Sequence, residues 1–223
     1  MHLLNNDIKK LDRHFRANLI NSSVGIKQAS LIGTINSKKR TNLALFSSAV
    51  HLGSNPALIA IFSRPSTEIP KQTLNNIILH KHYTINHVNE EIIDRSHSCS
   101  FKFSDKESEF NKCKLTERFS SDFDAPFVAE SNICLGLKYL RHFSIDENGV
   151  IMIIGKLDQI FVKDNFIQQN GEINFTSSDS IGVAGNNTYY KVNKLKTLEY
   201  MSITQVKGME ELIKIEKNKE KKI

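Results

Sequence analysis

The sequence predicts a mainly β barrel with a few peripheral helices. From residue 29 onward, six segments are short, apolar and rich in β-forming residues, and turn-like stretches such as "NSKKRTN", "GSNP" and "DENG" separate them. The same region contains only two short helical patterns, "PKQTLNNIILHK" and "EEIIDRSH". Many strands with few helices favour a barrel over a wound parallel sheet.

The composition is that of an ordinary globular domain. The 223 residues are 39% hydrophobic and 24% charged. The longest apolar runs, such as "VIMIIG", are too short to span a bilayer, and the N-terminal residues lack the pattern of a secretion signal. The three cysteines are widely spaced and form no C-x-x-C. We therefore expect a reducing, cytoplasmic location and no thiolate metal site.

The N-terminal residues 1–22 are predicted to form one amphipathic helix, because apolar residues recur at steps of three and four: Leu4, Ile8, Leu11, Phe15 and Leu19. Its apolar face would dock on the body or on a partner subunit. Residues 1–40 hold eight Lys and Arg against two Asp, whereas the body is nearly neutral. A solvated basic arm is expected rather than a nucleic-acid or membrane surface, with nucleic-acid binding at most weak and removed by salt.

The main domain is predicted over residues 23–203, with a Lys/Glu-rich C-terminal tail over 204–223. Its expected strands are residues 29–36, 43–52, 57–63, 83–88, 131–145 and 150–162. In the fifth of these, Ile133, Leu135, Leu137 and Tyr139 alternate as one buried strand face would. "DENG" between the last two strands predicts a hairpin. The two helical patterns lie at 70–81 and 90–97.

The stretch "FSRPSTEIPKQTLNNI" collects cations and hydroxyls at the expected start of the first of these helices. A helix N-terminus carries free N–H donors and partial positive charge. Together with Arg64, Ser66, Thr67, Lys71 and Thr73, it would form a site for a dianionic phosphate. Ordinary helix capping with solvated cations is the alternative. Neither G-x-x-x-x-G-K-[ST] nor G-x-G-x-x-G occurs, so a mononucleotide cofactor or a sugar phosphate is the expected ligand.

Several blocks, in order, resemble the flavin reductase-like family of FMN-binding split barrels. "TNLALFSSAVHLGSNPALIAIFSRPSTEIPKQTLNNI" is similar to the family's Asn-Leu-Ala-x-Phe-Ser block, its Ser-Asn-Pro-Pro turn and its phosphate loop. "YTINHVNEE", "SEFNKCKLT" and "DAPFVAES" are similar to later segments. The resemblance covers roughly residues 14 to 200. Departures include Ile26-Lys27-Gln28, where many relatives have Pro-Arg-Pro, and Ala57 in the proline turn.

The resemblance implies an antiparallel Greek-key split barrel, a homodimer, and FMN bound near the dimer interface. It also implies the residues that surround each part of the cofactor. Around the isoalloxazine it places Asn42, Phe46, Ser47 and Ser48, and around the phosphate it places Arg64, Ser66, Thr67, Lys71 and Thr73.

Two histidines are candidates for the substrate side of the flavin. His51 follows the serine pair, and His97 lies in "RSHSCSF", which resembles a segment that relatives place over the substrate. A structural role for either is the alternative. His80 and His82 would point apart, so no metal site is expected. No G-x-S-x-G frames a nucleophile for hydrolysis.

The leading hypothesis is therefore an FMN-binding oxidoreductase that takes hydride from NAD(P)H onto the flavin N5. Electrons would pass to free flavin, a metal complex or a protein. The alternative is a flavin-binding electron carrier or FMN store without NAD(P)H activity. A nucleic-acid-associated protein that uses the basic arm is the third hypothesis.

Overall fold

The computed structural model describes residues 1–65, 72–104 and 106–198. The chain divides into two units, residues 1–193 and 194–223, and all elements below belong to the first. The helices are α1 Asn5–Lys10, α2 Arg13–Ser23, α3 Gln72–His80, α4 Ile93–Ser98 and α5 Glu109–Lys112, with 3₁₀ turns η1 Glu90–Ile92 and η2 Asp164–Phe166. The strands are β1 Lys27–Gln28, β2 Ser30–Ile35, β3 Thr41–Phe46, β4 Val50–Ser54, β5 Ala57–Ser63, β6 His82–His87, β7 Glu117–Ser120, β8 Phe123–Val128, β9 Ile133–Ile145, β10 Val150–Val162, β11 Ile181–Ala184 and β12 Thr188–Lys191.

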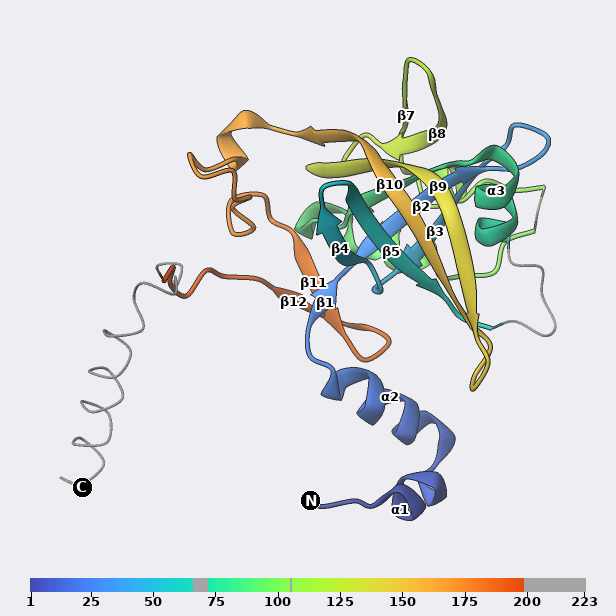
Figure 1. Cartoon of the computed structure of the whole chain (residues 1–223), viewed down its shortest axis with the longest axis vertical. Helices are drawn as coiled ribbons and strands as arrows, with labels where there is room; N and C mark the ends of the chain where they lie inside the picture. Colours follow the sequence, from blue (N-terminus) through green and yellow to red (C-terminus); the bar gives the residue numbers. More distant parts are fainter. Residues whose placement is uncertain (66–71, 105, 199–223) are drawn as a thin grey trace. The chain divides into compact units, whose positions relative to one another are not determined.

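Seven strands form one antiparallel sheet in the order β3-β2-β6-β9-β10-β5-β4 (Figure 1). A three-stranded sheet, β1-β11-β12, and the β7–β8 hairpin complete the β structure. The mainly β, antiparallel fold that the sequence predicts is confirmed. Strand β2 is buried along its whole length, because β3 and β6 pair with its two edges and its side chains Leu31 and Ile32 pack into two different apolar clusters.

The predicted hairpin at "DENG" is confirmed. Strands β9 and β10 each run for 13 residues and pair from Ile145↔Val150 to Ile133↔Val162. The turn closes through a 2.8 Å bond from the Gly149 N–H to the Ile145 carbonyl. Gly149 has φ +68°, a conformation that an L side chain disfavours, so glycine suits this corner.

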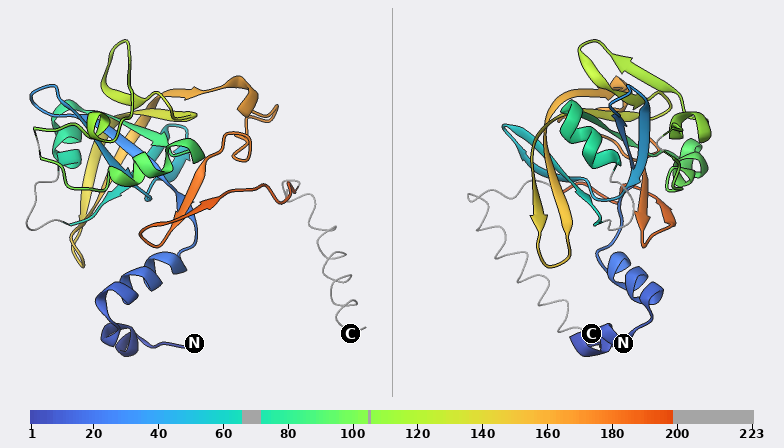
Figure 2. Two further views of the ribbon diagram at one scale, coloured as in Figure 1. Left: turned by 180° about the vertical axis from the view of Figure 1, so that it is seen from behind. Right: turned by 90° about the vertical axis from the view of Figure 1, so that its right-hand side faces the viewer.

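Helix α3 packs on the sheet through a buried apolar stripe. Leu74 is 6% exposed and Ile77 is fully buried, as the helical spacing predicts, and both join a cluster with residues of β2, β5, β6, β9 and β10. Figure 2 shows α3 between the β2–β3 hairpin and the β9–β10 hairpin. A second cluster joins β2 and β3 to α4, α5 and β11, so the sheet is covered on two sides.

The prediction of one helix over 1–22 is wrong. The chain breaks at Leu11 and Asp12, and Asp12 Oδ1 accepts the N–H groups of His14 (2.9 Å) and Phe15 (3.0 Å) as the N-cap of α2. The capping carboxylate starts a new helix inside the apolar repeat. No residue of α1 or α2 is buried, and Phe15 is 51% exposed.

Two further expectations differ from the structure. The strand predicted over 43–52 is two strands, β3 and β4, with residues 47–49 between them. The helix predicted over 90–97 is the 3₁₀ turn η1 followed by α4. The predicted domain end at residue 203 and the C-terminal tail at 204–223 lie outside the described residues and stay predictions.

Candidate functional site

A buried polar network joins β2, β3 and the start of α3. Asn42 is 7% exposed, and its Nδ2 lies 3.3 Å from Thr34 Oγ1 and 3.4 Å from Thr73 Oγ1. Asn76 Nδ2 donates to the same Thr34 hydroxyl at 3.0 Å. Two residues predicted for the site, Asn42 of the isoalloxazine set and Thr73 of the phosphate set, are therefore in direct contact.

The local sequence explains this convergence. Thr34 and Asn42 are opposite each other in the β2–β3 ladder, so their side chains point to the same face. Thr73 and Asn76 are three residues apart on α3 and share a face beside the buried stripe. Thr34 and Asn76 were not predicted as site residues, although Asn76 lies within the "TLNNI" block that carries the family resemblance.

Ser48 lies in the link between β3 and β4 and is bonded to the end of β5. Its hydroxyl donates to the Phe62 carbonyl at 3.0 Å and accepts the Phe62 N–H at 3.1 Å. The link that contains Ser47 and Ser48 is thereby tied to Phe62, which lies two residues before Arg64. Phe46 is partly buried against the α3 cluster. Ser48 thus fixes the link, and its hydroxyl hydrogen is already committed to a backbone carbonyl.

Arg64 follows β5 and is exposed. Its Nη2 donates to Asn186 Oδ1 at 3.3 Å, and Asn186 Nδ2 donates to Asn18 Oδ1 at 3.0 Å. Asn186 belongs to the β11–β12 turn, which the sequence prediction missed. The signal was present, because Gly185-Asn186 between β-forming residues is typical of a hairpin turn. The structure does not describe Ser66, Thr67 and Lys71, which lie in 66–71.

The two histidines predicted for the substrate side lie on different parts of the fold. His51, on the sheet-edge strand β4, is exposed and bonds Ser54 Oγ through Nε2 at 3.1 Å. His97, on α4, is exposed, and its Nδ1 lies 2.9 Å from the Tyr189 hydroxyl of β12. Burial raises the pKa of Tyr189. No contact among the described residues joins the two histidines.

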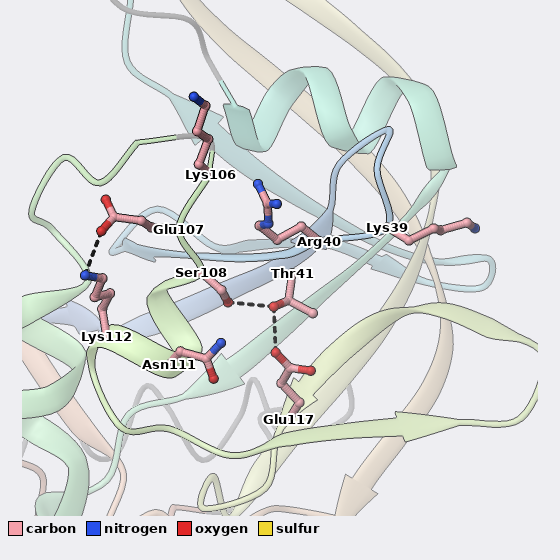
Figure 3. A pocket seen from close by; sticks show the side chains of 9 residues that line it. All are labelled: Lys39, Arg40, Thr41, Lys106, Glu107, Ser108, Asn111, Lys112 and Glu117. Atoms are coloured by element: carbon pink, nitrogen blue, oxygen red, sulfur yellow. Dashed lines mark hydrogen bonds and ion pairs between the residues drawn. The ribbon is translucent and has the colours of Figure 1, made fainter.

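A cavity of about 440 Å³ opens beside the start of β3, between the 36–40 turn and the segment before α5 (Figure 3). Its floor is a chain of bonds in which Thr41 Oγ1 meets Ser108 Oγ and Glu117 Oε1, each at 2.6 Å. At its side, Lys112 pairs with Glu107 at 2.6 Å. The cavity has four cations, Lys39, Arg40, Lys106 and Lys112, and two carboxylates, Glu107 and Glu117.

In the described part of the chain, no three His, Cys, Asp or Glu side chains are grouped so as to hold a metal ion. The helices described there are also too short or too polar to cross a membrane.

Comparisons with known proteins agree with the fold. Residues 26–176 match the family model of the flavin reductase-like domain. The chain belongs to the flavin reductase-like domain family. A split-barrel protein of the flavin reductase type from Shewanella frigidimarina is 39% identical, with a TM-score of 0.86 over 90% of this chain and 100% of that chain.

Two more distant similarities extend over most of this flavin reductase-like chain. An uncharacterised protein of Aquifex aeolicus is 24% identical over 185 residues, which are 82% of this chain and 93% of that protein. Component B of nitrilotriacetate monooxygenase from Bacillus cereus is 19% identical, with a TM-score of 0.79 over 89% of this chain and 98% of that chain, and shows a shared fold.

The protein is therefore a flavin-dependent oxidoreductase with the split-barrel fold of its family. The expected family and fold class are confirmed. The individual flavin contacts remain predictions of the family resemblance.

Proposed function

We propose that this flavin reductase-like protein binds FMN and is reduced by NAD(P)H, after which electrons pass to free flavin, a metal complex or a protein. When bound, the flavin supplies the chemistry of accepting hydride and releasing electrons. The residues of the chain supply binding, orientation and exclusion of water. The observation that carries the proposal is the convergence of β3, the β3–β4 link, the end of β5 and the start of α3.

The donors present fit a phosphate-bearing flavin. Arg64 makes one described hydrogen bond, to a neutral amide, so most of its five N–H groups remain for an anion. Thr73 Oγ1 accepts from Asn42, which leaves its own hydroxyl hydrogen for an acceptor nearby. Both residues flank the 66–71 segment, and the start of a helix favours negative charge.

The polar network orients the site. Asn42 is held on both sides by Thr34 and Thr73, so its amide direction is fixed by the sheet and the helix together. Ser48 ties the β3–β4 link to β5 through two hydrogen bonds. These bonds use the Ser48 hydroxyl and the Phe62 backbone, so they position Ser47 without using its backbone N–H. Phe46 supplies an apolar ring beside the same link. Preorganised donors of this kind stabilise charge that develops on a bound ring.

Anaerobic mixing of the FMN-loaded protein with NADH or NADPH tests the proposal. Loss of the visible flavin absorbance within seconds is the expected result. Flavin that stays oxidised with both donors, yet is reduced by dithionite, would mean an electron carrier or FMN store and would overturn the proposed reaction. Protein that binds no FMN would overturn the cofactor assignment as well.

A further inference from the structure

A second cavity lies between α2, the end of β5 and the β11–β12 turn. Its volume is about 510 Å³, which is within the range of small-molecule sites. Figures 1 and 2 both show the C-terminal end of α2 close to the β11–β12 hairpin. Arg64 lines this cavity, so it adjoins the proposed flavin phosphate site through a shared residue.

One face of α2 forms a wall of the cavity. The lining positions of this helix follow a spacing of three and four residues, which places them in one stripe. Arg13 and Arg16 lie at the N-terminal end of the stripe, and Ile20 and Val24 lie at its C-terminal end. The wall therefore offers cations at one end and an apolar surface, with Val24 73% exposed, at the other.

The positive charge in this cavity is not compensated by described acidic residues. Its cations are Arg13, Arg16, Lys27 and Arg64, and no Asp or Glu lines it. None of the four forms an ion pair with a residue in the described ranges. The cavity in Figure 3 differs, because two carboxylates, Glu107 and Glu117, offset part of its positive charge, and Glu107 pairs with Lys112.

The hydrogen bonds of these cations leave donors for a ligand. Lys27 Nζ is held by two carbonyls and the Asn21 amide, so it contributes charge. Arg16 uses one Nη1 bond to the Lys9 carbonyl, and the side chain of Arg13 has no hydrogen bond or ion pair to a described residue. A guanidinium has five N–H donors in a geometry suited to phosphate, so Arg13 and Arg16 keep most of theirs.

We propose that this cavity binds the adenosine phosphate part of a dinucleotide. The apolar surface of Ile20 and Val24 suits a flat base, and Arg13 and Arg16 suit its phosphate. This inference rests on the proposed function, because Arg64 would then lie between the flavin phosphate and the second nucleotide part. The adenosine phosphate has two sources, the NAD(P)H donor or the adenylate half of FAD.

Direct titration of the purified protein tests the proposal without turnover. Calorimetry with adenosine 2′,5′-bisphosphate, ADP and adenosine is expected to show binding of the two phosphorylated compounds and none of adenosine. Arg13→Ala and Arg16→Ala should each weaken ADP binding about tenfold. The matched control is Arg141→Ala, which removes an exposed arginine of β9 that does not line the cavity and should leave ADP binding unchanged.

Two further arms separate the sources. If the adenylate of FAD occupies the cavity, FAD binds more tightly than FMN, and the Arg13→Ala, Arg16→Ala double variant removes the difference. If the nicotinamide donor occupies it, the double variant raises KM for NADPH at least tenfold and leaves kcat unchanged.

The proposal is overturned if ADP does not bind while FMN does, a result that leaves the proposed function intact. It is also overturned if the double variant alters the dimerisation constant and not ADP affinity, because the cavity would then be an interface between copies. Failure to bind FMN would instead contradict the proposed function itself.

Discussion

His87 of β6 makes stability depend on pH. Burial lowers its pKa to about 4, with its ring stacked on Phe175 and its Nδ1 3.4 Å from Ser180 Oγ. The unfolded chain has a histidine pKa near 6.5 and binds the proton first. The stabilising contribution of neutral His87 is thus fully present above about pH 6.5 and is lost as the pH falls toward about 4. The loss in the free energy of unfolding should be roughly 2–3 kcal/mol, which is less than the full pKa shift implies because the ring is partly exposed.

Urea unfolding at pH 7.0 and 4.5 measures this loss, and His87→Gln should make the two free energies of unfolding closer. Burial also lowers the pKa of His82, so some dependence should remain in the variant. His51→Gln is the control, because His51 is exposed on the edge strand. An unchanged pH dependence in His87→Gln would exclude His87 as its source.

Glu109 anchors β3 from outside the sheet. It is 5% exposed, its Oε2 accepts the Leu43 N–H at 3.0 Å, and burial raises its pKa. Glu109→Leu leaves the buried N–H without a partner and should cost about 1–3 kcal/mol in the free energy of unfolding. Glu109→Gln keeps an acceptor and should cost less. Chemical denaturation of both variants checks the order, and equal losses would contradict the role of the bond.

At the scale of elements, the contact between β2 and β8 depends on Gly33. A Cβ at this position would overlap the Pro126 carbonyl and the Thr84 hydroxyl, which are themselves bonded at 2.6 Å. Gly33→Ala should therefore destabilise the protein by about 1–3 kcal/mol or more, seen as a lower Tm. Gly53→Ala in β4 is the control, because the nearest atom to its Cβ lies 3.8 Å away. Similar Tm values for the two variants would contradict the packing argument.

For the whole molecule we propose a homodimer, as the family resemblance implies. Apolar side chains are exposed in single chains at places that a partner could cover: Val50 (47%) and Leu52 (46%) on β4, and Phe143 (47%) on β9. Edge strands with exposed apolar residues are normally covered. Light scattering at micromolar concentration should give twice the mass of one chain. The Leu52→Asp variant should give a mass closer to that of a single chain. A wild-type monomer that still binds flavin would refute the dimer.

The sequence was sufficient for the fold class, the long hairpin and α3, because hydrophobic periodicity and turn residues act locally. It failed where a single polar contact outweighs periodicity, as at Asp12, which divides the predicted N-terminal helix. It also missed Asn186, whose relevance comes from its contact with Arg64, 122 residues away. Family motifs brought Asn42 and Thr73 into the candidate set, and tertiary packing alone places them together.

The affinity difference between FMN and riboflavin tests the central claim most directly. Only FMN carries the anion that Arg64 and Thr73 would contact, so it should bind at least tenfold more tightly to the wild type. Arg64→Ala should weaken FMN about ten- to a hundredfold and Thr73→Val less, because a charge-assisted bond is stronger than a neutral one. Riboflavin affinity should stay nearly constant. Calorimetric titration that gives equal affinities for FMN and riboflavin in the wild type would contradict the proposed phosphate site.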